Sequence, residues 1–285
     1  MKLNIKTIIN TVLFPVTLII ASSAYADMSQ QKYFSELESI ANDSFRSEEN
    51  IQRNAFRHPA ETLTFFGLEP QMSVLEVWPS KGWYTEILAP FLKTNGKLTL
   101  AQFSQDTGEF RNERSVFWAK ISAKLQQQIE ENTDYFGQVS LVELEPPLLV
   151  NATTEQFDMV LSFRNAHIWN EDGHLQATLQ TLFNALKPGG ILGMVEHRAS
   201  RLSDIASSAS NGYLDEAYVI AAAQSVGFEL VATSEVNANP LDSKNYPRGV
   251  YTLPPTLAMG AEDKDYYVAI GESDRMTLKL RKPIE

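Results

Sequence analysis

Short apolar segments alternate with amphipathic segments along most of the chain. Residues 157–163 are nearly all apolar, which is typical of a strand buried on both faces of a sheet. Residues 112–131 instead carry apolar side chains at helical spacing, among them Leu125 and Ile129. By these criteria the sequence predicts strands at 73–78, 98–103, 139–144, 157–163, 191–197, 228–232 and 276–280.

Helical patterns lie between the predicted strands, and each connection is long enough for a crossover. Strands that alternate with helices in this way favour a parallel sheet covered on both faces. The sequence therefore predicts an α/β fold with a doubly wound, mostly parallel sheet. The helices are predicted at 83–88, 112–131, 172–185 and 214–226.

Two segments stand outside this alternation. Residues 27–72 contain only helical patterns, and they predict an N-terminal helical cap before the first strand. Residues 237–274 are irregular and rich in Asn, Asp, Pro and Tyr. A long irregular segment inside a compact domain is usually functional, so we expect a lid-like insertion there. The α/β domain itself is expected to span 73–285.

The first 26 residues have the pattern of a cleavable signal peptide. Lys2 and Lys6 precede an apolar stretch from Ile8 to Ile20, and Ala24-Tyr25-Ala26 resembles a cleavage site. An uncleaved membrane anchor is the alternative, although the apolar stretch is short for a span. The sequence therefore predicts an exported protein, periplasmic or secreted, that has no membrane contact after cleavage.

Charge and cysteine content narrow the possible functions. The formal net charge is −11, and loss of the two signal-peptide lysines makes it two units more negative. Such a chain repels phosphate backbones, which argues against nucleic acid as a partner. The chain has no cysteine, which excludes disulfides, thiolate metal sites and a cysteine nucleophile.

The most informative stretch runs from residue 73 to residue 88. A β-rich segment contains Glu76, a turn follows at Pro79-Ser80-Lys81-Gly82, and a helical pattern begins at Trp83. A strand, tight turn and helix in this order place free backbone N–H groups and a helix N-terminus against a ligand. Residues 186–190, Leu-Lys-Pro-Gly-Gly, precede a later strand.

These segments together resemble the class I S-adenosylmethionine-dependent methyltransferases, in particular a group of exported bacterial predicted methyltransferases. The resemblance implies a seven-stranded Rossmann-like sheet whose last strand is antiparallel. It also implies S-adenosylmethionine as the methyl donor and a small molecule as the acceptor. It covers residues 57–283, with matches at 79–86, 163–167, 195–198, 212–218, 239–240 and 271–275.

Ligands of open α/β sheets bind beyond the carboxyl ends of the strands. This rule and the resemblance together give the expected donor-binding residues. They are Glu76, Trp78, Pro79, Gly82, Trp83, Tyr84, Gln102, Arg164 and Asn165.

Two of these positions depart from the family pattern. The family has glycine at every second position after the acid, whereas this chain has Trp78, Ser80 and Gly82. The Trp78 indole either forms a wall that attracts the sulfonium, by about 0.5–2 kcal/mol, or packs into the core. Gln102 replaces the carboxylate that holds the ribose hydroxyls, which predicts weaker or altered donor binding.

Histidines at the strand ends are the candidate bases, because imidazole titrates in the useful range. We expect His197 to be the first choice and His167 the second, with a loop-orienting role as the alternative for each. Arg164 and Arg198 would bring positive charge to an anionic acceptor or to the donor's carboxylate; the alternative is ion pairs with Asp158, Glu196 or Asp215. His167, Asp172, His174 and His197 follow no metal-ligand spacing, so no metal site is predicted.

Two functions remain open from the sequence. The first is an exported methyltransferase that acts on an unidentified small molecule. The second is a periplasmic small-ligand-binding protein on a degenerate methyltransferase scaffold, which the lost glycines and the missing ribose carboxylate favour. Binding of S-adenosylmethionine to the purified protein would separate them.

Overall fold

The computed structural model describes residues 16–105, 113–150, 152, 154–200 and 210–284. The first fifteen residues of the predicted signal peptide lie outside this part of the chain. Its remaining residues belong to α1 (Val16–Ala41), which continues past the predicted cleavage site. Among the described residues, no helix combines the length and the apolar character needed to span a membrane.

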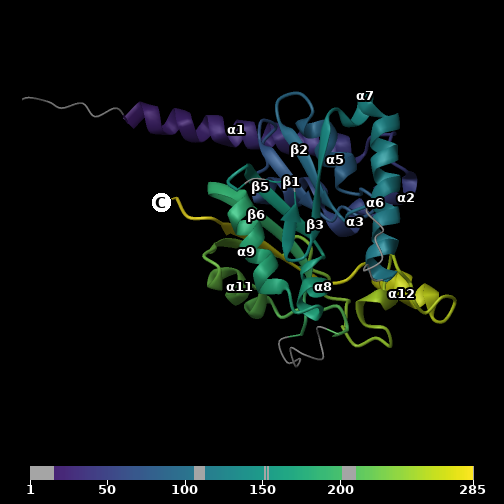
Figure 1. Ribbon diagram of the computed structural model, residues 1–285. Helices are drawn as coiled ribbons and strands as arrows, with labels where there is room; N and C mark the ends of the chain where they lie inside the picture. Colours follow the sequence, from purple (N-terminus) through teal and green to yellow (C-terminus); the bar gives the residue numbers. More distant parts are fainter. Residues whose placement is uncertain (1–15, 106–112, 151, 153, 201–209, 285) are drawn as a thin grey trace, which may run out of the picture.

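A single eight-stranded sheet forms the centre of the molecule (Figure 1). β1 lies between β2 and β5: the chain runs from β1 outward to β4 and then returns to β5 on the other side of β1. The order across the sheet is β4-β3-β2-β1-β5-β6-β8-β7. The strands are β1 (Ser73–Val77), β2 (Lys97–Gln102), β3 (Val139–Glu145), β4 (Leu148–Val150), β5 (Phe157–Phe163), β6 (Leu186–His197), β7 (Glu229–Ser234) and β8 (Arg275–Arg281).

The predicted mostly parallel sheet is confirmed, but the strand count of seven is wrong by one. β4 is the additional strand, and it pairs antiparallel with β3 at the edge of the sheet. Three residues of β4 are too few to give a readable alternation of apolar and polar side chains. β8 runs antiparallel to both of its neighbours, β6 and β7, as the resemblance implied.

The strand predicted at 191–197 is longer than expected, because the glycine-containing segment at 187–190 belongs to it. β6 already begins at Leu186. The backbone N–H of Gly189 donates to the carbonyl of Lys282, and the N–H of Lys282 donates to the carbonyl of Gly190. Because the chain beyond β8 supplies these partners, the segment is held as an extension of the strand.

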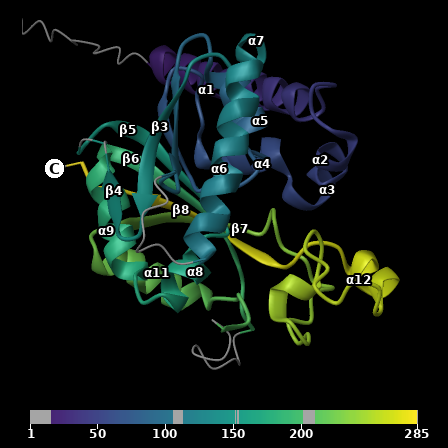
Figure 2. The same cartoon turned by 45° about the vertical axis from the view of Figure 1, so that its right-hand side comes forward.

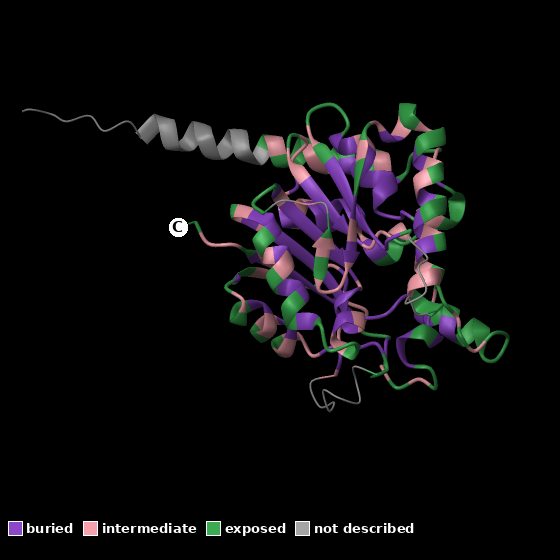
Figure 3. Cartoon of the chain, in the orientation of Figure 1, coloured by how far each residue is buried: buried purple, intermediate pink, exposed green. Residues whose placement is uncertain are grey.

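Helices cover both faces of the sheet, and the sheet between them is the most deeply buried layer (Figure 3). One face packs against α8 (Ala166–Glu171), α9 (Leu175–Ala185) and α11 (Glu216–Ser225). The other packs against α1, α4 (Pro59–Phe66), α5 (Thr85–Leu92), α6 (Glu113–Glu131) and α7 (Thr133–Phe136).

The helices before β1 contribute to one face of the sheet rather than forming a separate cap. Leu37 of α1 and Phe66 of α4 are fully buried in the same cluster as strand residues of β1 and β5. The short helices α2 (Glu48–Gln52) and α3 (Asn54–Arg57) connect α1 to α4. Arg57, the last residue of α3, is buried and reaches the cavity described below.

The irregular segment at 237–274 contains η1 (Gly249–Thr252) and α12 (Lys264–Ile270), which lie to one side of the sheet (Figure 2). A small apolar cluster of Leu253, Tyr267 and Ile270 holds it together. Asn239 fixes its start to its end by donating from Nδ2 to the carbonyls of Ile270 and Glu272. Residues of this segment form part of the wall of the cavity.

Candidate active site

A cavity of about 300 Å³ lies at the carboxyl ends of β1, β5 and β6. This is the switch point of the sheet, where open α/β folds bind their ligands, and the volume lies at the lower end of the usual range for small-molecule sites. Most of the predicted site residues line it. They are Glu76, Trp78, Pro79, Trp83, Tyr84, Arg164, Asn165, His167 and His197.

The loop after β1 keeps a glycine-type backbone although two of its glycines are replaced. Trp78, Ser80 and Gly82 have φ values of 45°, 57° and 84°, all in the left-handed region. This conformation costs a residue with a side chain about 1–2 kcal/mol. Strain of this kind persists where the surroundings enforce it, often beside a functional site.

Gly82 supports the loop from behind and does not line the cavity. Its N–H donates to the carbonyl of Pro79 over 2.9 Å, which closes the turn. A Cβ at Gly82 would lie 2.5 Å from Cδ1 of Leu125 in α6. The glycine therefore allows the turn to pack directly on α6.

The Trp78 indole forms a wall of the cavity and does not fill it. Nε1 of Trp78 donates to the carbonyl of Leu144 over 3.0 Å, and its ring stacks on Phe103 with the centroids 4.2 Å apart. Phe103 in turn stacks on Trp118 of α6 at 6.2 Å. The two interpretations of Trp78 therefore combine, since the ring packs against the core on one side and faces the cavity on the other.

Glu76 faces the cavity from β1 but is almost completely buried, with 1% of its surface exposed. Within the described part of the chain its hydrogen-bond partner is the Thr85 hydroxyl, which donates to Oε2 over 2.7 Å. Burial raises the pKa of Glu76 to about 8, and the Thr85 hydrogen bond offsets this only in part. The side chain is therefore mostly a neutral acid at pH 7, available to ionise when a cation arrives.

Asn165 and Gln102 both come from strand ends but differ in where their side chains lie. Nδ2 of Asn165 donates to the carbonyl of Val77 over 2.8 Å, which ties the ends of β5 and β1 together beside the cavity. Gln102 was predicted to hold the ribose, yet it does not line the cavity. It shares its strand face with Leu98 and Leu100, and its Nε2 is buried without a hydrogen bond within the described structure.

Arg198 was a predicted catalytic residue, but the structure places it outside the cavity. Its guanidinium forms ion pairs with Asp274, Glu235 and Glu216 at 2.9, 2.7 and 3.3 Å. The ion-pair interpretation is therefore the one that the structure supports, although with other partners than those expected. A guanidinium held by three carboxylates has little charge to offer a ligand.

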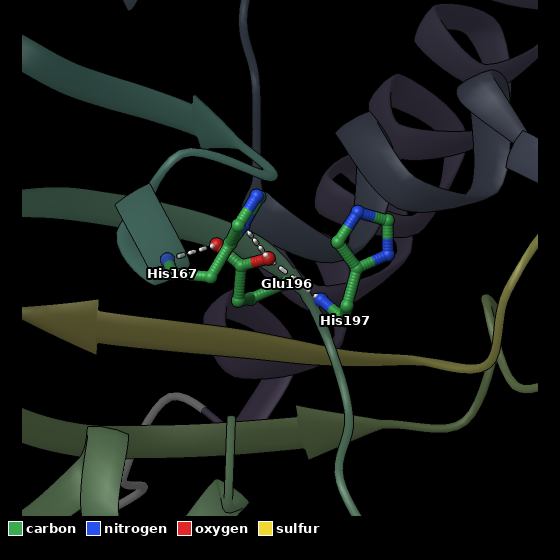
Figure 4. A group of neighbouring side chains, drawn as sticks. All are labelled: His167, Glu196 and His197. Atoms are coloured by element: carbon green, nitrogen blue, oxygen red, sulfur yellow. Dashed lines mark hydrogen bonds and ion pairs between the residues drawn. The ribbon is translucent and has the colours of Figure 1, made fainter. Parts of the chain in front are cut away.

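His167 and His197 lie side by side at the end of β6, with Glu196 between their backbones (Figure 4). Nδ1 of His167 lies 2.9 Å from Oε1 of Glu196, and its backbone N–H donates to Oε2 over 3.2 Å. The carboxylate thereby fixes the ring orientation and places the proton on Nδ1. Nε2 is left as the acceptor, 3.3 Å from the Tyr251 hydroxyl.

His197 is held differently, by Ser273 Oγ at 2.6 Å from Nδ1. Burial lowers the pKa of His197 well below its usual value, and His167, Arg275, Arg164 and Arg57 lower it further by their positive charge. His197 is therefore a neutral imidazole at pH 7. The geometry favours His167 over His197 as a base, because among the described residues the His167 ring has a carboxylate partner and the His197 ring has a hydroxyl.

Four arginines surround one buried carboxylate, Glu272, at the side of the cavity that adjoins the histidines. Arg53 and Arg57 bind Glu272 at 2.7 and 2.9 Å, Arg275 also binds it, and Arg164 lies 3.8 Å away. These charges hold the pKa of Glu272 well below its ordinary value despite its burial. Arg57, Arg164 and Arg275 line the cavity, so this end of it is strongly positive.

The ligand atoms of His167, Glu196 and His197 lie within 4.8 Å of one another, close enough to hold a metal ion. The other two residues considered from the sequence lie apart from this cluster. Asp172 forms an ion pair with Arg114 at 2.9 Å, and His174 lines a neighbouring hollow. The positive charge of the arginines that line the same cavity opposes the binding of a metal cation there.

Sequence reasoning missed several residues of the site. Glu196 was considered only as an ion-pair partner, and Tyr251 lay in a segment with no readable chemistry. Arg57 was included only within the predicted N-terminal cap, and Glu272 and Arg275 only within the matching segment 271–275. The acid directly before His197 was the one usable signal.

The sequence matches no protein-family model and no curated protein significantly. Solved structures, however, match over most of its length. A SAM-dependent methyltransferase from Aquifex aeolicus is 15% identical with a TM-score of 0.53, and the match covers 87% of this chain and 98% of that one. A proposed sarcosine dimethylglycine methyltransferase from Galdieria sulphuraria is 10% identical with a TM-score of 0.55, covering 84% and 90%.

The [4+2]-cyclase SpnF matches equally well, with 18% identity, a TM-score of 0.53 and coverage of 90% and 97%. A shared fold therefore does not decide the reaction, which has to be argued from the site. The chain has the class I fold of solved SAM-dependent methyltransferases.

Proposed function

We propose that the protein is an S-adenosylmethionine-dependent methyltransferase that acts on a small molecule. The observation that carries this proposal is the loop after β1, where Trp78, Ser80 and Gly82 keep left-handed backbones beside a cavity at the switch point. The strained conformations at Trp78 and Ser80 would be unnecessary in a loop that only connects a strand to a helix.

The chain's residues fit the charge and shape of the donor. S-adenosylmethionine supplies an electrophilic methyl group on a positively charged sulfur. The Trp78 ring offers an aromatic face to that charge, and Phe103 and Trp118 extend the aromatic surface. Glu76 can ionise on the arrival of a cation, which would supply a counter-charge without a permanently buried anion.

His167 is placed to accept the proton of the acceptor's nucleophile. Transfer of the methyl group to the nucleophile would leave the electron pair of the carbon–sulfur bond on sulfur, so the protein's own residues have only the nucleophile's proton to take up. The proton lost by the nucleophile goes to Nε2 of His167, and Glu196 stabilises the resulting imidazolium. In-line transfer of this kind depends mainly on alignment, which the cavity walls provide.

The test is titration of the purified protein with S-adenosylmethionine and with S-adenosylhomocysteine by calorimetry. Trp78→Ala should weaken binding on the order of tenfold, because it removes the aromatic wall. Phe117→Ala is the matched control, since Phe117 is an exposed aromatic residue of α6 that does not line the cavity. Absence of heat at millimolar concentrations of both compounds would refute the proposal. The alternative, a binding protein for another small ligand, would then be favoured.

We also propose that the protein is exported, on the strength of Lys2 and Lys6, the apolar stretch from Ile8 to Ile20 and the Ala24-Tyr25-Ala26 sequence. N-terminal sequencing of the protein recovered from an expressing bacterium tests this. A chain that begins at Asp27 in the periplasm or medium is expected, and a chain retained with its first residues in the cytoplasm contradicts export.

A further inference from the structure

The positive end of the cavity is built from parts of the chain that lie far apart in sequence. Arg57 ends α3, Arg164 follows β5, and Arg275 begins β8. Arg53 lies 219 residues from Glu272, with which it shares a hydrogen bond. Within this group, Glu272 supplies one negative charge against four positive ones, so a net charge of about three remains partly buried.

Two of the arginines also have unused hydrogen-bond donors. Nη2 of Arg57 and Nε of Arg275 are buried and have no hydrogen-bond partner among the described residues. Both side chains line the cavity, and each residue is only 2% exposed. Buried donors of a charged group are rarely left unsatisfied, because the cost is high. These two donor atoms are themselves shielded, but the side chains of Arg57, Arg164 and Arg275 line the cavity. The net positive charge of the group therefore favours a ligand that accepts hydrogen bonds and carries negative charge.

The cavity has two chemically different ends. Trp78, Phe103 and Trp118 form an apolar wall on the β1–β2 side, whereas the arginines lie on the β5–β8 side. Arg275 pairs directly with His197 in the register of β6 and β8, so the positive end adjoins the two histidines. A ligand group held by the arginines would therefore bring its neighbouring atoms close to the imidazoles.

We propose that Arg57, Arg164 and Arg275 bind a carboxylate or phosphate group of the methyl acceptor. This inference rests on the proposed function and names the class of its substrate: a small molecule with an acidic group. The planar forks of the guanidinium groups match the paired oxygens of either anion. The acidic group anchors the acceptor beside His167, and its nucleophilic atom faces the loop after β1.

The test measures binding of inorganic phosphate and of acetate to the full chain by calorimetry. Arg164→Gln should weaken binding of whichever anion binds more tightly to the wild type by about tenfold or more, as expected for the loss of a charge-assisted hydrogen bond. Arg164 is chosen because its 3.8 Å contact with Glu272 is the longest of the four, and Arg164→Lys keeps the charge should the glutamine variant fold poorly. Arg281→Gln is the matched control, because Arg281 lies on β8 but outside the cavity and pairs with Glu229.

A second arm separates the acceptor from the donor, which has a carboxylate of its own. The anion titration is repeated with the protein saturated with S-adenosylhomocysteine, and again with 5′-methylthioadenosine, which lacks the carboxylate. Unchanged anion binding in both cases supports the inference. Competition by S-adenosylhomocysteine alone would assign the arginines to the donor and overturn it.

The remaining outcomes distinguish the two proposals. If the donor binds but neither anion does, the inference is overturned and the proposed function stands. If an anion binds but the donor does not, the proposed function is refuted, and the assignment of the arginines to a methyl acceptor is refuted with it.

Discussion

The buried acid Glu76 makes the stability of the protein depend on pH in an unusual direction. The pKa of Glu76 is raised from 4.5 to about 8 in the folded chain. Between these values the unfolded chain gives up a proton that the folded chain keeps. The free energy of unfolding therefore falls as the pH rises through this window, and the loss is complete above pH 8.

The magnitude follows from the same two values. Each pH unit inside the window costs about 1.4 kcal/mol, so the cost at pH 7 is about 3 kcal/mol. Glu76→Gln removes the titration but keeps an oxygen that accepts the hydrogen bond from Thr85. The variant should match the wild type near pH 4.5 and exceed its free energy of unfolding by about 3 kcal/mol at pH 7.

Urea unfolding followed by tryptophan fluorescence at pH 5, 6, 7 and 8 measures this difference directly. Only the difference between variant and wild type matters, because every other titrating group contributes equally to both. Glu38→Gln is the control, since Glu38 is an exposed carboxylate of α1 and its substitution should leave the difference flat. A difference for Glu76→Gln that does not change between pH 5 and pH 8 would refute the reasoning.

Three further predictions follow from the same site. Binding of S-adenosylmethionine at pH 7 should release close to one proton from the wild type and none from Glu76→Gln, as measured by calorimetry in buffers of different ionisation enthalpy. Glu272→Gln should lower the free energy of unfolding by about 3–5 kcal/mol, since it leaves the surrounding arginines uncompensated, and urea titrations at pH 7 measure the loss. Because the pKa of Glu272 is depressed, the wild type should lose this stabilisation as the pH falls below about 4.5. In an acid titration the free energy of unfolding of the variant should show no such loss. Gly82→Ala should cost about 1–3 kcal/mol through overlap with Leu125, whereas Gly173→Ala, at another left-handed glycine with open space around it, should cost less by thermal unfolding.

The fold was predictable where burial alone decides the local structure. The apolar segment at 157–163 coincides with β5, because both faces of a central strand must be apolar. The extension of β6 back to Leu186 could not be predicted, since its partner Lys282 reaches Gly189 and Gly190 only when β8 is in place. Local sequence carries no signal for such a contact.

The sequence predicted which strand ends carry the residues of the site, but not the direction in which each side chain points. Gln102 ends β2 as expected, yet successive residues of a strand point to opposite faces, and its side chain falls on the side of Leu100. The four arginines around Glu272 were not predictable as a group, because Arg53 and Arg57 lie more than two hundred residues from Glu272 in the sequence. Distant charges converge only through the tertiary fold.

The position of β8 between β6 and β7 determines when the cavity can first exist during synthesis. Until residues 275–281 have left the ribosome, β6 has an open edge and β7 has no neighbour to join. The same residues deliver Arg275, and the segment just before them delivers Glu272, so the positive end of the cavity is completed last. A nascent chain released before this point would contain the residues of the aromatic wall and both histidines, but it would lack the strand that joins β6 to β7 and the residues that complete the site for an acidic ligand.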